Sequence, residues 1–211
     1  VDTGRLVLVE GALPDCLPTT IDTRTALPIA RIVHAAASVR FSDAYAAHTI
    51  QTNDLGTQRL LEWADALSVD EFHFVSTAFV CGCGEEPFPE TVHAQPACFR
   101  NVYEQSKWQA EQHVWRWAKL RGTSATIYRP SIVVGAHATG RISSFTGLYL
   151  AFRAFDVISR AIGTDTKMRQ RLPLRLEGSD ECRLNLIPVD YLGSLLADII
   201  STPELHQRVY N

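Results

Sequence analysis

The sequence predicts an α/β fold built on a doubly wound, mostly parallel sheet. Two observations predict it. Short apolar segments typical of buried strands alternate along the 211 residues with stretches of helical periodicity, each about 10–20 residues long. Connections of that length give right-handed crossovers between parallel strands. The chain also lacks internal repeats and low-complexity tracts, so one compact domain of ordinary size is expected.

Five apolar segments predict strands, each short enough to cross a sheet once. They are residues 5–9 (RLVLV), 31–34 (RIVH), 71–76 (EFHFVS), 124–128 (SATIY) and 184–187 (LNLI). Pro130 ends the fourth, because proline cannot donate a backbone hydrogen bond to a neighbouring strand. Residues 208–210 begin a further element at the end of the chain.

Four stretches carry apolar residues at helical spacing, so we expect helices there. They are residues 44–67, 102–121, 145–163 and 189–200. In the first of them the inner side is formed by Ile50, Leu60, Leu61 and Ala64.

The longest segment without regular structure is predicted at residues 77–101, which carry three prolines. A loop of that length in a compact domain is more often functional than idle. Like the segments after His34 and Tyr128, it leaves the sheet at the carboxyl end of a strand, where open α/β sheets bind their ligands. We therefore expect the functional site at this edge.

The composition excludes several classes of protein. With 20 basic and 23 acidic residues the net charge is -3, which gives no basic surface for nucleic acid. No apolar run approaches the roughly 18 residues of a membrane span, and residues 1–25 show no secretion signal, so a cytoplasmic protein is expected. Five cysteines without a C-x-x-C pair predict reduced thiols. Cys81 and Cys83 have no partners at zinc-finger spacing, so no metal site is expected.

Tyr103 and Lys107 form the sharpest local signal. They are four residues apart on a predicted helix and therefore project from one face. A nearby ammonium favours tyrosinate, so we expect Lys107 to lower the pKa of Tyr103. A tyrosine tuned in this way can exchange a proton with a carbonyl or carbinol oxygen. The alternative is an ordinary helix with a half-buried tyrosine and a solvated lysine.

Two further polar residues lie where they can assist. Thr77 directly follows the strand at 71–76, so its hydroxyl can reach the substrate oxygen that Tyr103 protonates. Alternatively, it only begins a turn. Asn53 and Gly56 are poor formers of helix interiors, so Gly56 is expected to permit close packing and the Asn53 amide to bond a specific partner. A local irregularity of the helix is the alternative.

Taken together, these motifs resemble the extended short-chain dehydrogenase/reductase superfamily. The resemblance rests on residues 34–41 (HAAASVRF), 53–57 (NDLGT), 75–78 (VSTA), 103–107 (YEQSK), 128–135 (YRPSIVVG) and 186–191 (LIPVDY). Within the superfamily the chain is most similar to the fatty acyl-CoA reductases and carrier-protein thioester reductases, the branch with the male-sterility-type NAD-binding domain. The resemblance implies a Rossmann-like sheet.

The resemblance implies a role for each matching residue. Tyr103 would be the general acid, Lys107 would hold the nicotinamide ribose, and Thr77 would help to bind the substrate oxygen. Asn53 is similar to the residue that supports the proton relay behind the lysine. The cofactor would lie against Ala35, Ala36, Ser38, Ser76, Tyr103, Lys107, Pro130 and Ile132.

The implied reaction is reduction of an acyl thioester, bound to CoA or to a carrier protein, to an aldehyde or alcohol. NADPH is the usual donor of the branch, and NADH is possible. Residues 140–183 would bind substrate, with aromatic and aliphatic side chains that either face an acyl chain or pack on the core: Phe145, Leu148, Tyr149, Phe152 and Phe155. The alternatives are a sugar-nucleotide epimerase or dehydratase, a hydroxysteroid-type dehydrogenase, and a non-catalytic Rossmann-like binding domain.

The chain departs from the family at its beginning. It has no Gly-rich turn to hold the pyrophosphate, and the strand at 5–9 corresponds to the third strand of the family. We therefore expect residues 1–211 to form a single but partial NAD(P)-binding domain that lacks the first β-α-β-α stretch. Such a chain is expected to bind cofactor weakly, to be inactive in isolation and to self-associate through its exposed sheet edge. Ala12 also stands where the family places an aspartate at the adenine.

Overall fold

The computed structural model describes residues 10–15, 29–83, 88–94, 98–143, 147–163 and 183–211. The chain divides into two compact units. The first comprises Val1–Ser131 with Leu196–Asn211, and the second comprises Ile132–Leu195. The expected strand at residues 5–9 lies outside the described residues.

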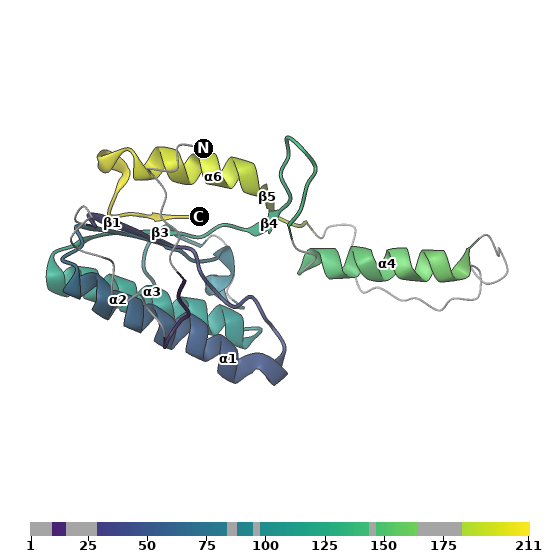
Figure 1. The fold of residues 1–211 in the computed structure, drawn as a ribbon, viewed down its shortest axis with the longest axis horizontal. Coiled ribbons are helices and arrows are strands. Elements are labelled where there is room, and N and C mark those ends of the chain that lie inside the picture. Colours follow the sequence, from purple (N-terminus) through teal and green to yellow (C-terminus); the bar gives the residue numbers. More distant parts are fainter. Residues whose placement is uncertain (1–9, 16–28, 84–87, 95–97, 144–146, 164–182) are drawn as a thin grey trace. The chain divides into compact units, whose positions relative to one another are not determined.

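The first unit is built on a four-stranded parallel sheet with the strand order β1-β2-β3-β6 (Figure 1). The strands are β1 (Arg31–His34), β2 (Glu71–Val75), β3 (Ser124–Tyr128) and β6 (Val209–Tyr210). The central pair is fully in register, from Glu71 opposite Ser124 to Val75 opposite Tyr128, whereas β6 adds only two residue pairs to β3. The parallel sheet predicted from the sequence is confirmed.

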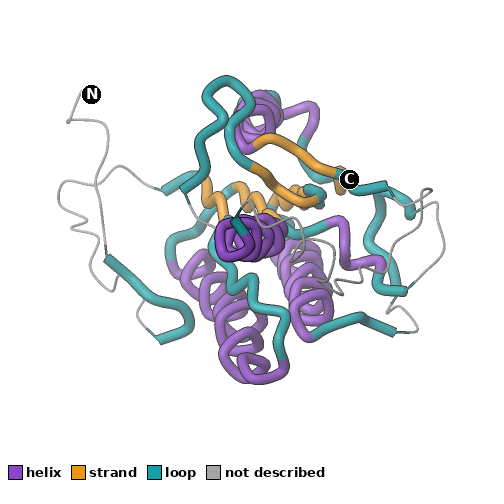
Figure 2. Tube along the Cα trace, turned by 90° about the vertical axis from the view of Figure 1, so that its right-hand side faces the viewer, coloured by secondary structure: helices purple, strands orange, loops and turns teal. Residues whose placement is uncertain are grey.

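Helices lie over both faces of this sheet (Figures 1 and 2). One face is covered by α1 (Ala46–Ile50), α2 (Gly56–Ala66) and α3 (Val102–Arg121), and the last residues of α6 (Val189–Ile200) lie over the other. The apolar core between the sheet and α2 and α3 includes Phe72, Phe74, Ile127, Leu61 and Val114. Among the described residues, no helix has the length and hydropathy needed to cross a membrane.

The ends of α3 are set by local chemistry. The side chain of Asn101 accepts a hydrogen bond from the backbone N–H of Glu104, which caps the first turn. Gly122 follows the last turn with φ +68°, a left-handed conformation that glycine adopts without strain. These two residues explain why the helix has the bounds that the sequence predicts.

The predicted helix at 44–67 is interrupted. A 3₁₀ turn (Asp43–Tyr45) leads into α1, and a π-helical turn (Gln51–Leu55) separates α1 from α2. Asn53 lies in the π turn, so the local irregularity named as the alternative is present, and its amide also bonds specific partners, Ser38 and Ser106. A Cβ added to Gly56 would lie 2.9 Å from the Cβ of Leu13, which confirms that Gly56 permits close packing.

The second unit holds a parallel pair of strands, β4 (Ile132–Val134) and β5 (Leu186–Pro188), and α4 (Leu148–Ile162). The sequence did not predict β4, and it placed β5 slightly earlier. Within this unit the backbone N–H of Gly135 donates to the Tyr149 hydroxyl at 2.8 Å, and the Asp190 carboxylate accepts from two backbone N–H groups near His137. Phe145 and most of residues 164–183 lie outside the described residues.

The expectation that the cysteines are reduced is wrong for two of them. Cys83 and Cys98 form a disulfide, with their Cα atoms 5.6 Å apart. The backbone N–H of Cys83 also donates to the carbonyl of Cys98 at 3.1 Å, so the two ends of this loop are held together by the main chain as well. Their spacing has no recognisable motif, which is why the sequence did not predict the pairing. Cys81 is a free thiol.

Candidate active site

Tyr103 and Thr77 meet at the carboxyl end of β2. Thr77 lies just past this strand, is buried, and begins a short 3₁₀ turn (Ala78–Cys81) by accepting a bond from the Phe79 backbone N–H. Tyr103 lies in the first turn of α3, and its phenol interacts with the Thr77 side chain, which acts to lower the pKa of the phenol. The ring of Phe41 packs edge-on against it, with ring centroids 5.3 Å apart. The structure thus brings together the two hydroxyls that the sequence predicts to share one substrate oxygen.

Lys107 is buried rather than solvated, with only 2% of its surface exposed. Its Nζ donates to the Val75 carbonyl at 2.8 Å and lies 4.1 Å from the centroid of the Phe74 ring. Burial lowers the pKa of Lys107 to about 7, and the nearby Glu111 carboxylate opposes this shift. The ammonium has three N–H donors, and Val75 accounts for one of them.

The pKa of Tyr103 moves in the direction opposite to the expected one. Burial raises it, and the hydrogen bond with Thr77 only partly opposes that effect. The Lys107 ammonium is bonded to the Val75 carbonyl. Desolvation of the phenolate therefore determines the direction of the shift.

Asn53 connects α1 and α3 to the segment that follows β1. Its Oδ1 accepts from the Ser38 backbone N–H at 2.7 Å, and its Nδ2 donates to the Ser38 carbonyl at 2.9 Å and to Ser106 Oγ at 3.0 Å. Ser106 Oγ donates in turn to the Tyr103 carbonyl at 2.9 Å. Asn53 thus fixes the backbone near Tyr103, whereas the resemblance assigns it to a proton relay behind Lys107.

His34, which begins the HAAASVRF motif, has a structural role that its sequence context did not predict. His34 is buried, and its Nε2 lies 3.1 Å from Thr57 Oγ1. Because the Thr57 hydroxyl donates to the Asn53 carbonyl at 2.6 Å, Nε2 is the donor in the bond to Thr57. Burial, together with the Lys107 charge, lowers the pKa of His34 to about 3. The neutral imidazole of His34 therefore extends the hydrogen bonds around Asn53 by one further step, through Thr57.

A buried ion pair between Arg129 and Glu111 was also missed. Both side chains are fully buried, and the guanidinium donates to both carboxylate oxygens, at 2.8 and 3.0 Å. It also donates to the carbonyls of Pro89 and Thr91. One turn past Lys107, Glu111 therefore anchors the end of β3 and the described segment 88–94 to α3. The signal in the sequence that could have pointed to this pair is the run Tyr128-Arg129-Pro130, because it puts a charged residue at the end of a buried strand.

The predicted cofactor-binding residues follow the ends of β1, β2 and β3 or lie in the first turns of α3, and one of them begins β4. Ala35 and Ala36 are exposed just past β1, and Ser38 is buried against Asn53. The Pro130 carbonyl accepts from the Ala78 backbone N–H at 2.9 Å, which places it beside Thr77. Ile132 is the first residue of β4 and belongs to the second unit.

These residues fit the nicotinamide half of a dinucleotide. Ser76 Oγ is buried with no hydrogen-bond partner among the described residues, so a donor or acceptor remains to be satisfied there. Lys107 offers N–H groups beyond the one that Val75 takes, and the exposed Ala35 and Ala36 carry only methyl side chains.

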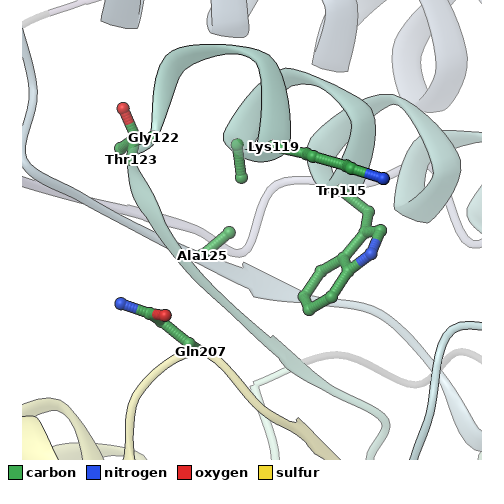
Figure 3. A pocket seen from close by; sticks show the side chains of 7 residues that line it. Trp115, Lys119, Gly122, Thr123, Ala125 and Gln207 are labelled. Atoms are coloured by element: carbon green, nitrogen blue, oxygen red, sulfur yellow. The ribbon is translucent and has the colours of Figure 1, made fainter.

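A hollow of about 460 Å³ lies elsewhere in the first unit, at the far end of α3 (Figure 3). Its lining comes from the last turns of α3, the start of β3 and the turn before β6, and includes Trp115, Lys119, Ala125 and Gln207. Tyr103, at the first turn of the same helix, does not line it. The hollow is therefore separate from the candidate active site.

A parallel sheet covered on both faces, with a Tyr-x-x-x-Lys helix beside a threonine at a strand end, defines an NAD(P)-binding domain of the extended short-chain dehydrogenase/reductase type. Residues 17–195 match the family described as male sterility protein, and the chain belongs to that family. The resemblance drawn from the sequence, the α/β class and the nicotinamide cofactor are thereby confirmed.

Three relatives show which kinds of protein the chain is similar to within this family. The non-canonical nonribosomal peptide synthetase FrzA of Cladobotryum sp is 27% identical over 193 residues, which cover 85% of this chain and 17% of that protein. An isonitrile lipopeptide synthase of Streptomyces coeruleorubidus is 36% identical over 127 residues, 58% of this chain and 8% of its own length. The solved terminal R domain from the myxalamid PKS-NRPS biosynthetic pathway is 29% identical, with a TM-score of 0.63, over 82% of this chain and 40% of that one. The chain thus spans less than half of each.

Proposed function

We propose that the protein is a reductase that uses a nicotinamide cofactor to convert an acyl thioester into an aldehyde or alcohol. The observation that carries this proposal is the pairing of Tyr103 with Thr77 at the carboxyl end of β2, where the buried Lys107 bonds the Val75 carbonyl. Membership of the male sterility protein family and similarity to two peptide synthetases support a thioester as the substrate.

The proposed chemistry divides between the cofactor and this chain. When bound, the cofactor supplies a hydride to the thioester carbonyl carbon. The hydroxyls of Tyr103 and Thr77 donate to the carbonyl oxygen as negative charge develops on it. The C–S bond then breaks, the leaving thiolate takes up a proton from solvent, and the products are an aldehyde and a free thiol. Reduction of the aldehyde to the alcohol would take a hydride from a second cofactor molecule, and Tyr103 would give its proton to the alkoxide.

Lys107 acts on the cofactor side in this proposal. The N–H groups of Lys107 that do not bond Val75 would hold the nicotinamide ribose. The ammonium group would also return a proton to Tyr103 after each turnover. Asn53 acts as a positioning residue, since it holds Ser38 and, through Ser106, the first turn of α3. We assign NADPH as the donor, as is usual in this branch.

A carrier-bound acyl chain is the substrate we propose; similarity to a nonribosomal peptide synthetase and to the terminal R domain of a PKS-NRPS pathway supports this choice over free acyl-CoA. Residues 140–183 are assigned to substrate selection. Their described helix α4 exposes Phe152 and Phe155, side chains suited to contact an acyl chain.

The test is a spectrophotometric assay of NADPH oxidation by the full-length protein. One acyl group is offered both on a carrier protein and on CoA, and aldehyde is trapped and quantified. We expect one aldehyde per NADPH and faster turnover of the carrier-bound form. Turnover of a sugar nucleotide or a hydroxysteroid, with none of either thioester, would instead support the epimerase or dehydrogenase alternatives. NADPH binding without turnover of any substrate would indicate a binding domain.

A further inference from the structure

A second cluster of polar side chains lies at the opposite end of the sheet from Thr77. Glu71 begins β2, His73 follows two residues later on the same strand, and His206 lies shortly before β6. One donor atom from each lies within 4.8 Å of the other two. Only 1% of His73 and 8% of His206 is exposed, so both imidazoles are inside the protein.

The hydrogen bonds of His206 fix which of its ring nitrogens is free. Its Nε2 lies 3.0 Å from the Ile199 carbonyl, which can only accept, so Nε2 carries the hydrogen. In the neutral ring Nδ1 is then a lone pair, and it faces Glu71 Oε1 at 3.6 Å. Two acceptors facing each other require a cation between them or a proton on the ring.

His73 also has a ring nitrogen that no protein group satisfies. Its Nδ1 is 2.8 Å from the Tyr128 hydroxyl and can donate to it, whereas its Nε2 is buried with no hydrogen-bond partner among the described residues. That Nε2 lies 3.6 Å from Glu71 Oε2, too far for a hydrogen bond. A fully buried polar atom without a partner needs an explanation.

We propose that Glu71, His73 and His206 bind a zinc ion. Ligand atoms at about 2.0–2.2 Å around tetrahedral zinc are separated by about 3.3–3.6 Å. His73 Nε2 lies 3.6 Å from Glu71 Oε2, and His206 Nδ1 lies 3.6 Å from Glu71 Oε1, so each imidazole is at ligand spacing from one oxygen of the carboxylate. Two imidazoles and a carboxylate form a common zinc ligand set. The groups that bond the other ring nitrogens also fit a zinc site, because a histidine that binds zinc donates its second N–H to a carbonyl or similar acceptor. Ile199 and Tyr128 provide these acceptors, and Arg31 holds the Glu71 carboxylate.

The zinc would have a structural role. β6 is joined to β3 through only two residue pairs, so its attachment to the sheet is slight. An ion held by His206 and by two residues of β2 would join the segment before β6 directly to the second strand. Because Glu71 and Thr77 lie at opposite ends of β2, the ion would take no part in the reduction of the thioester.

The test is calorimetric titration of the chelator-treated protein with ZnCl₂, followed by thermal unfolding. We expect one zinc per chain and a rise in Tm of about 5–10 °C at a zinc concentration of about 100 Kd. Glu71→Gln and His206→Gln should each weaken binding more than about tenfold. His113→Gln is the matched control, since His113 also pairs with a carboxylate, that of Asp54, at 2.8 Å outside the cluster. It should leave binding unchanged.

Two results would overturn the proposal: no zinc binding by the unmodified protein, or unchanged affinity in both cluster variants. Should those variants fail to fold, Co²⁺ added to the unmodified protein decides the question. We expect the visible bands of tetrahedral cobalt without a thiolate charge-transfer band. A thiolate band would place the metal on cysteine and reject the cluster.

Discussion

The Nζ of Lys107 donates a 2.8 Å hydrogen bond to the backbone carbonyl of Val75, the last residue of β2. This bond joins the first turns of α3 to the strand end where Thr77 leaves the sheet. Tyr103 lies one turn before Lys107, so the same contact sets how closely the phenol approaches Thr77. The geometry of the candidate active site therefore depends on a lysine that is held inside the protein.

Replacing Tyr103 with phenylalanine tests the proposed acid. Tyr103→Phe should lower the rate of thioester reduction by about 10²–10⁴-fold, because it removes the proton donor without changing the ring. Cofactor affinity should change little. Steady-state assays with fluorescence titration of NADPH measure both quantities. Tyr210→Phe is the control, since its hydroxyl bonds the Leu205 carbonyl at the β6 edge, and it should keep its activity. An active Tyr103→Phe enzyme would exclude the assigned role.

Lys107 predicts a dependence of stability on pH. Burial lowers its pKa from 10.5 to about 7, so between these values the unfolded chain binds a proton that the folded chain has released. The contribution of Lys107 to stability therefore rises with pH above about 7, by up to about 1.4 kcal/mol per pH unit. Urea unfolding of the unmodified protein and of Lys107→Met at several pH values measures it. The exposed Lys119→Met is the control. A difference that stays constant with pH would contradict the shift.

The ion pair of Arg129 and Glu111 predicts a large loss of stability when one partner is removed. Arg129→Met should lower the free energy of unfolding by about 3–5 kcal/mol, because the Glu111 carboxylate is left buried and unpaired. The double variant Arg129→Met/Glu111→Leu should recover part of that loss. Denaturant unfolding measures both. Arg59→Ala, which breaks an exposed pair with Glu62, should have no measurable effect. Equal losses in the single and double variants would count against this explanation.

Asn53 predicts a combined effect on stability and turnover. Asn53→Leu keeps the side-chain volume but leaves the Ser38 backbone groups without partners, which should cost about 2–4 kcal/mol of unfolding free energy. The turnover number should fall more than cofactor affinity, because Ser106 and the first turn of α3 lose their anchor. Gln51→Leu in the same π turn is exposed and should behave like the unmodified protein. A variant of normal stability and turnover would remove Asn53 from the site.

Much of the fold could be predicted because the local signals agree with the packing. Helix α3 has its predicted bounds since Asn101 and Gly122 mark its ends in the sequence. The meeting of Tyr103 and Thr77 followed from a general property of parallel sheets, whose strand ends gather at one edge. Three short features were not predicted: the π turn, β4 and the Cys83–Cys98 disulfide. The π turn has the composition of a helix, and β4 is only three residues long.

The electrostatics of the site could not be predicted from spacing. Tyr103 and Lys107 are four residues apart, but how far each is buried depends on tertiary packing, and burial determines the direction of both pKa shifts. The pair of Arg129 and Glu111 and the cluster that contains His206 were missed for the same reason. Their members are adjacent only in the folded chain.

The π-helical turn at Gln51–Leu55 also sets the phase of the helix around it. Each residue of an α-helix advances the side-chain direction by about 100°, and a π turn takes in one residue more than an α turn. The extra residue is therefore absorbed within the turn, and α1 and α2 continue in phase on either side of it. The wide turn is what lets the Asn53 amide face Ser38 while Gly56, at the start of α2, packs against Leu13.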